Sequence, residues 1–163
     1  MDSPKYTVLV VDDEELIREL VFTILSNLGH SCITATNGID ALDKMKGKKF
    51  DVVITDIKMP EMDGIILTRE ISRQYPGLPV MVMTGFDEEY SAGTAISVGA
   101  REFIKKPFSL EEFSLRLRKM IADSETLGQL KIEKEKEEDF QDIMNELEAA
   151  LKKSEETAKS KLR

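Results

Sequence analysis

Five short apolar runs alternate along the chain with segments whose apolar residues recur at helical spacing. The runs are largely continuous rather than alternating, and continuous runs are typical of strands that are covered on both faces, as in a parallel sheet. Glycines and prolines separate many of the segments. The predicted strands are 7–11, 31–36, the run ending at Asp56, 79–83 and 101–105.

This alternation predicts an α/β fold: a doubly wound five-stranded parallel sheet with helices on both faces. Right-handed crossovers leave few ways to thread such a sheet. We expect the flavodoxin-like strand order 2-1-3-4-5, because the first, third and fourth strands are the most apolar and the second and fifth look like edges.

The pattern changes near Asp123. We expect residues 1–122 to form the domain and 123–163 a charged helical extension, because segment 131–139 is almost entirely charged and glutamate and lysine favour helix. Three interpretations of the extension stay open: a solvated helix or linker, a coiled coil with a second copy, or a helix folded back on the domain. A helical apolar stripe of about two heptads follows the charged run, made of Phe140, Ile143, Met144, Leu147, Ala150 and Leu151.

The amino-acid composition bears on the cellular location and the partners of the protein. Acidic residues outnumber basic ones, 31 to 23, which argues against a basic face for nucleic acid. No apolar stretch approaches the ~18 residues that span a bilayer, and the start of the chain has no signal-peptide core. The one cysteine, Cys32, cannot form an internal disulfide and fits a reduced compartment as a small core residue. We therefore expect a soluble, cytoplasmic protein without a membrane or direct nucleic-acid partner.

Candidate chemistry lies at the strand ends. Asp12, Asp13, Asp56, Thr84 and Lys106 each follow or end a predicted strand. In the expected order the three acids share one pocket, with Thr84 and Lys106 on its far rim. Crowded carboxylates normally need a cation, and Mg²⁺ is the natural occupant. Such a site suits a phosphoryl group, with Asp56 as the nucleophile.

Four motifs carry a family resemblance. They are Val10-Val11-Asp12-Asp13, the segment from Asp56 to Gly64, Met83-Thr84-Gly85, and the segment from Gly99 to Phe108. Together, in this order and at strand ends, they resemble the response-regulator receiver domain of two-component signalling. The resemblance runs from about Lys5 to Ala122 and is highly specific as a set.

The resemblance implies roles for the acids. Asp56 would accept a phosphoryl group from a histidine kinase or phosphotransfer protein. Asp13, Asp56 and the backbone carbonyl of Lys58 would ligate Mg²⁺, and Asp12 would hold a metal-bound water. Such a domain is a phosphoacceptor with slow self-dephosphorylation rather than an enzyme.

It also implies a switch. Lys106, joined to Pro107 by a peptide bond that is cis in the family, would pair with the phosphate, and Gly85 would leave room for it. Thr84 and Phe103 would then move together, changing the face made by the fourth helix, fifth strand and fifth helix, which is also a candidate homodimer surface. Because Phe103 lacks a tyrosine hydroxyl, its coupling would rest on packing alone.

Two side hypotheses concern Phe86 and His30. Phe86 could screen the acyl phosphate from water, or only cover apolar surface. His30, the single histidine, should be a solvated loop residue, and without a nucleotide-binding glycine pattern it argues against a histidine kinase.

Other functions remain as alternatives. A haloacid-dehalogenase-type phosphohydrolase would place Asp-x-Asp after the first strand, whereas here Asp12-Asp13 precedes Glu14 and no cap domain is recognisable. A phosphorylation-independent scaffold or dimerisation module is the other alternative. The sequence after Ala122 shows no helix-turn-helix, cyclase or phosphatase pattern that would indicate an output function.

Overall fold

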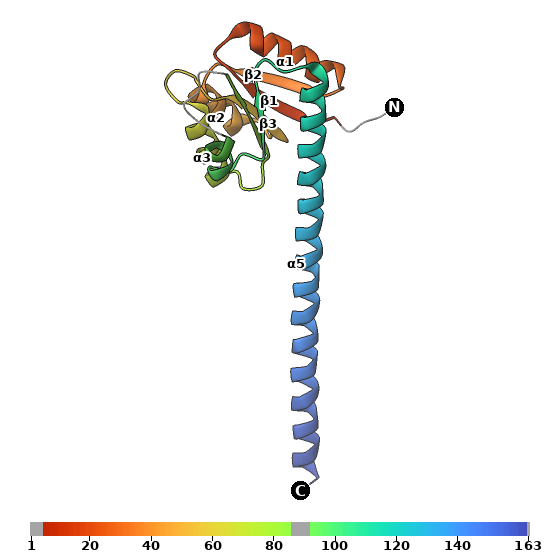
Figure 1. The fold of residues 1–163 in the computed structure, drawn as a ribbon. Helices are drawn as coiled ribbons and strands as arrows, with labels where there is room; N and C mark the ends of the chain where they lie inside the picture. The colour runs from red at the N-terminus through yellow and green to blue at the C-terminus, as the bar shows by residue number, and fades with distance from the viewer. Residues whose placement is uncertain (1–4, 86–91, 163) are drawn as a thin grey trace. The chain divides into compact units, whose positions relative to one another are not determined.

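The computed structural model describes residues 5–85 and 92–162 and contains a five-stranded parallel sheet (Figure 1). The strand order is β2-β1-β3-β4-β5, which confirms the predicted doubly wound fold. The strands are β1 (Thr7–Val11), β2 (Ser31–Ala35), β3 (Val52–Asp56), β4 (Val80–Thr84) and β5 (Glu102–Lys105). The helices are α1 (Glu15–Asn27), α2 (Gly38–Gly47), α3 (Gly64–Gln74), α4 (Ala92–Ser97) and α5 (Leu110–Lys161).

Apolar cores lie on both faces of the sheet, which explains the continuous apolar runs. On one face, Leu9 and Val53 of the sheet pack with residues of α2, α3 and α4. On the other face, Val10 and Ile54 pack with residues of α1 and with Phe113 and its neighbours on α5. Because successive strand residues point to opposite faces and both faces are covered, the central strands β3 and β4 are apolar except toward their carboxyl ends, where Thr55, Asp56 and Thr84 lie.

Local signals set several helix ends. The Asn37 side chain accepts a hydrogen bond from the Asp40 backbone N–H (2.8 Å), and Asp63 does the same for Ile66 (2.8 Å). The Ser109 hydroxyl accepts from the Glu112 N–H at the start of α5 (3.0 Å). Each cap satisfies a donor that the first helical turn leaves without a partner. The cap predicted at Asp87 lies outside the described residues.

The contacts divide the chain into two compact units, Met1–Ser124 and Glu125–Arg163. The division falls two residues beyond the boundary that the change in sequence pattern predicts. Helix α5 includes residues of both units, and the predicted helical character of the extension is confirmed. Within the described part of the chain, no helix has the length and apolar character needed to cross a membrane.

The prediction that His30 is a solvated loop residue was wrong. Instead of being solvated it is partly buried, its Nδ1 accepts a hydrogen bond from the Tyr6 backbone N–H (3.3 Å), and its ring lies 5.4 Å from the Tyr6 ring. The cause is parallel pairing, which places the turn before β2 beside the start of β1. Burial lowers the pKa of His30, so the neutral imidazole that accepts this bond is favoured.

Candidate functional site

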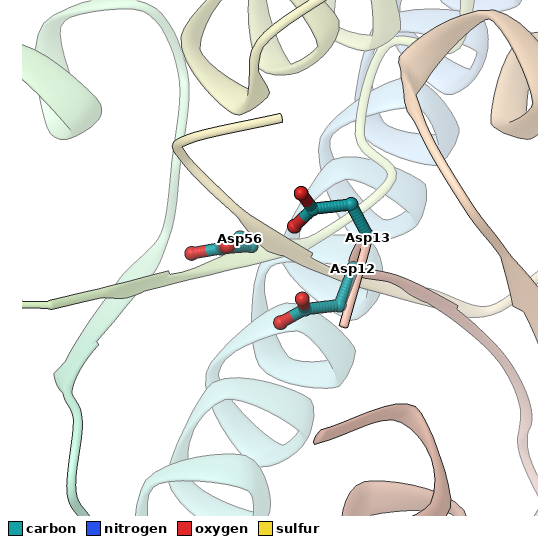
Figure 2. A group of neighbouring side chains, drawn as sticks. All are labelled: Asp12, Asp13 and Asp56. Carbon is teal, nitrogen blue, oxygen red and sulfur yellow. The ribbon is translucent and has the colours of Figure 1, made fainter. Parts of the chain in front are cut away.

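Three carboxylates meet at the carboxyl ends of β1 and β3. Asp12, Asp13 and Asp56 each offer an oxygen within 4.8 Å of the others (Figure 2). The pairing of Val11 with Thr55 causes this, because it sets the residues that follow β1 beside the last residue of β3. Asp12 and Asp56 are buried, whereas Asp13 is exposed. The predicted acidic cluster is therefore present in the fold.

Lys106 lies inside this cluster. Its Nζ is 3.0 Å from Oδ2 of Asp12 and 3.2 Å from Oδ1 of Asp56. The prediction that Lys106 stands on the far rim was wrong, because the long side chain reaches from the end of β5 across β4 to the acids. The Lys106 backbone N–H donates to the Thr84 carbonyl (2.7 Å), and the Lys106–Pro107 peptide bond is cis, as the resemblance implied.

Backbone donors orient the two buried acids. The Ile57 N–H donates to Oδ1 of Asp56 (2.9 Å), and the Glu14 N–H donates to Oδ1 of Asp12 (2.9 Å). The Arg18 guanidinium also donates to the Asp12 backbone carbonyl (2.7 Å). The site is thus held by the first residues after each strand and by the first turn of α1.

Burial and mutual repulsion disfavour ionised carboxylates here. Burial raises the pKa of Asp56 to about 6, and the Asp12 charge acts in the same direction, while Lys106 opposes both. Burial likewise raises the pKa of Asp12, although the Glu14 N–H and Lys106 favour its ionised form. Burial alone would lower the pKa of Lys106. The Asp56 and Asp12 carboxylates have the larger effect, so its pKa is raised and Lys106 is an ammonium ion at neutral pH.

Gly64 closes the loop after β3 and was missed as a site residue. Its N–H donates to the Ile57 carbonyl (2.7 Å), and a Cβ at this position would overlap the Asp56 carbonyl oxygen. The motif ending in Gly64 was the available signal, but its physical reason is visible only in the fold. Lys58 lies in the same loop with an exposed side chain, and the metal role of its carbonyl stays a prediction.

Thr84 and Phe103 occupy neighbouring strands. Thr84 is buried at the end of β4, and its hydroxyl donates to the Gly85 carbonyl (3.3 Å). Phe103 is half-buried on β5 and packs against the core that α2, α3 and α4 cover. The Arg116 guanidinium donates to the Phe103 carbonyl (2.9 Å), a contact that sequence reasoning did not anticipate. Phe86 lies outside the described residues, so its hypothesis stays a prediction.

Sequence relatives match about three quarters of the chain. The chain is 35% identical over 120 residues to the probable transcriptional regulatory protein TcrX of Mycobacterium tuberculosis, covering 74% of this chain and 51% of that protein. It is 35% identical over 118 residues to the alkaline phosphatase synthesis transcriptional regulatory protein PhoP of Bacillus subtilis, covering 72% and 49%. The chain thus spans about half the length of these relatives.

Solved structures show the same fold. A response regulator receiver domain protein of Clostridium thermocellum superposes with a TM-score of 0.70 at 31% identity, covering 75% of this chain and 98% of that one. NtrX of Brucella abortus superposes with a TM-score of 0.74 at 35% identity, covering 78% and 30%.

The family model described as the response regulator receiver domain matches residues 8–118, which is most of the first unit. Its span includes all three acids, Thr84 and Lys106. The chain therefore belongs to the response regulator receiver domain family.

Proposed function

We propose that Asp56 is the phosphoacceptor of a two-component system and receives its phosphoryl group from a histidine kinase or phosphotransfer protein. One observation carries the proposal: the buried Asp56 carboxylate lies beside two further acids and 3.2 Å from the Lys106 ammonium. Lys106 supplies one positive charge for a phosphoryl dianion on Asp56, and the neighbouring acids supply ligands for a cation that would add more.

The donor set fits Mg²⁺. Asp12, Asp13 and Asp56 supply only oxygen, which is what a hard divalent cation prefers. Lys106 offsets one of the negative charges and leaves the cluster with a surplus that a cation would neutralise. Asp13, Asp56 and the Lys58 carbonyl would hold the ion, and Asp12 would hold a water bound to it. When bound, Mg²⁺ would neutralise charge on the phosphoryl oxygens.

The proposed transfer is a single displacement at phosphorus. An Asp56 carboxylate oxygen attacks the phosphorus, the phosphorus–nitrogen bond to the donor imidazole breaks, and an aspartyl phosphate forms. The imidazole nitrogen takes up a proton as it leaves. Lys106 holds its ammonium charge beside Asp56 throughout and pairs with a phosphoryl oxygen in the product.

Phosphorylation would then bias a switch. Thr84 would turn its hydroxyl from the Gly85 carbonyl to a phosphoryl oxygen, and Phe103 would follow into the space behind it. Phe103 belongs to β5, so this would alter the face formed by α4, β5 and the first turns of α5. That face is the proposed output surface. On this view the chain is a phosphoacceptor with slow self-hydrolysis.

Intact mass measurement tests the proposal. Wild type incubated with acetyl phosphate and Mg²⁺ should gain the mass of one phosphoryl group. Asp56→Asn and a sample in EDTA should show no gain, whereas Asp43→Asn, which changes an exposed acid on α2, should match wild type. No gain in wild type would favour the alternative, a phosphorylation-independent scaffold or dimerisation module.

A further inference from the structure

The second unit exposes an apolar stripe. Every described residue from 125 to 162 is exposed, although several are large and apolar. Four of them recur at spacings of four, three and four residues, which is the a/d pattern of a coiled coil. These four, named the stripe below, are Phe140 (65% exposed), Met144 (37%), Leu147 (53%) and Leu151 (66%).

A helix of this kind needs a partner. Helices in water gain most of their stability from packing an apolar face, and contiguous exposed apolar surface usually marks an interaction site. Ile143, also exposed, widens the stripe on one side. Charged segments lie on both sides of the stripe along the chain.

The charges flanking the stripe have opposite sign. Segment 129–139 carries five acidic and three basic side chains, a net charge of −2. Segment 152–162 carries four basic and two acidic side chains, a net charge of +2. In a parallel pair of identical helices each segment would face its own copy and be repelled. In an antiparallel pair the acidic segment of one helix lies along the basic segment of the other, and charge complementarity of this kind fixes orientation.

We propose that the stripe binds a second copy of this chain as an antiparallel helix pair, centred between Asn145 and Glu146. This register sets Phe140 opposite Leu151 of the second copy and Met144 opposite Leu147. All four stripe residues are then packed in the interface between the two helices. Two heptads form a short interface, and we expect a dissociation constant on the order of 10 μM. The proposal concerns the second unit and does not depend on phosphorylation of Asp56.

Label distances distinguish the orientations. In a Cys32→Ala background, which removes the single native thiol, a nitroxide label is placed in the full chain at Lys131→Cys, Ser160→Cys or Asn145→Cys. Residues 131 and 160 face each other in the antiparallel register. At ~1.5 Å rise per residue, like labels at either end should lie roughly 45 Å apart, whereas a mixture of the two should give distances under about 20 Å. The Asn145 label should give a short distance in either orientation.

Substitutions test the surface. Leu147→Asp should shift the sedimentation equilibrium to monomer by weakening association at least about tenfold, since it buries a charge in the layer. Ala149→Asp introduces the same side chain on the opposite side of the helix and should leave the dissociation constant within about twofold.

The outcomes are decisive in each case. Short distances for like labels at both ends would show a parallel pair and overturn the proposal. A monomer at up to about 200 μM protein, including one whose extension folds back on its own domain, would overturn it as well. A dimer with short mixed-label distances that Leu147→Asp abolishes supports it.

Discussion

At the scale of single residues, one ammonium group forms ion pairs with two buried carboxylates. Lys106 contacts both Asp12 and Asp56, and removing it would leave two buried acids without their shared counter-charge. We predict that Lys106→Met lowers the free energy of unfolding by about 2–4 kcal/mol at pH 7.5 in EDTA, measured by urea denaturation. Lys105→Met, at the exposed neighbouring position, should change it by less than about 0.5 kcal/mol.

The same contacts predict coupling. Asp56→Asn removes one of the two charges that Lys106 neutralises, so Lys106→Met should cost less in that background. Additive losses in the double variant would contradict the arrangement, because groups in direct contact should not act independently.

Asp56 should also impose a pH dependence. Its pKa is about 6 in the folded chain against an ordinary value of 3.8, so the folded state binds more protons between these values. The stability that protonation of Asp56 gives the folded chain is therefore fully present below about pH 4, and it is lost as the pH rises through 6. In EDTA, Asp56→Asn should be more stable than wild type by about 1–3 kcal/mol at pH 7.5. An equal gain at pH 4 would contradict this origin.

Gly64 tests how closely the loop must approach Asp56. Gly64→Ala places a methyl group against the Asp56 carbonyl, so the backbone must shift. We expect a loss of about 2 kcal/mol or more and slower phosphorylation by acetyl phosphate. Gly47→Ala, where nothing lies within 4 Å of the added carbon, should instead be neutral or stabilise by up to about 1 kcal/mol.

At the scale of elements, Arg116 ties the first turns of α5 to β5. Its guanidinium contacts the Glu102 carboxylate and the Phe103 carbonyl, each at 2.9 Å, and Glu112 at 3.2 Å. We predict that Arg116→Ala lowers stability by about 1 kcal/mol and speeds amide hydrogen exchange in β5 several-fold. Arg118→Ala, on the exposed side of the same turn, should leave the exchange of β5 unchanged.

At the scale of the whole molecule, the two units separate chemistry from association. All of the proposed site residues belong to the first unit. We therefore predict that a chain ending at Ser124 is phosphorylated by acetyl phosphate within about twofold of the full-chain rate, but sediments as a monomer. A large loss of phosphorylation with retained folding would show that the second unit contributes to the site.

The sequence alone determined the order of elements, the sheet order and the meeting of Asp12, Asp13 and Asp56. These follow from general constraints: continuous apolar runs mark strands covered on two faces, right-handed crossovers leave few threadings, and the less apolar second and fifth strands belong at the edges. Once the strand order is known, residues at the carboxyl ends of adjacent parallel strands must be neighbours.

Only the tertiary structure decided how side chains complete the site. Lys106 crosses β4 to both acids, and Gly64 lies against the Asp56 carbonyl. Outside the acidic cluster, His30 accepts a hydrogen bond from Tyr6, and Arg116 donates to the Phe103 carbonyl. Each of these depends on where a side chain ends in space. Local patterns encode the backbone and the face of each residue, but the reach of a long side chain across a neighbouring strand is set by the packed fold.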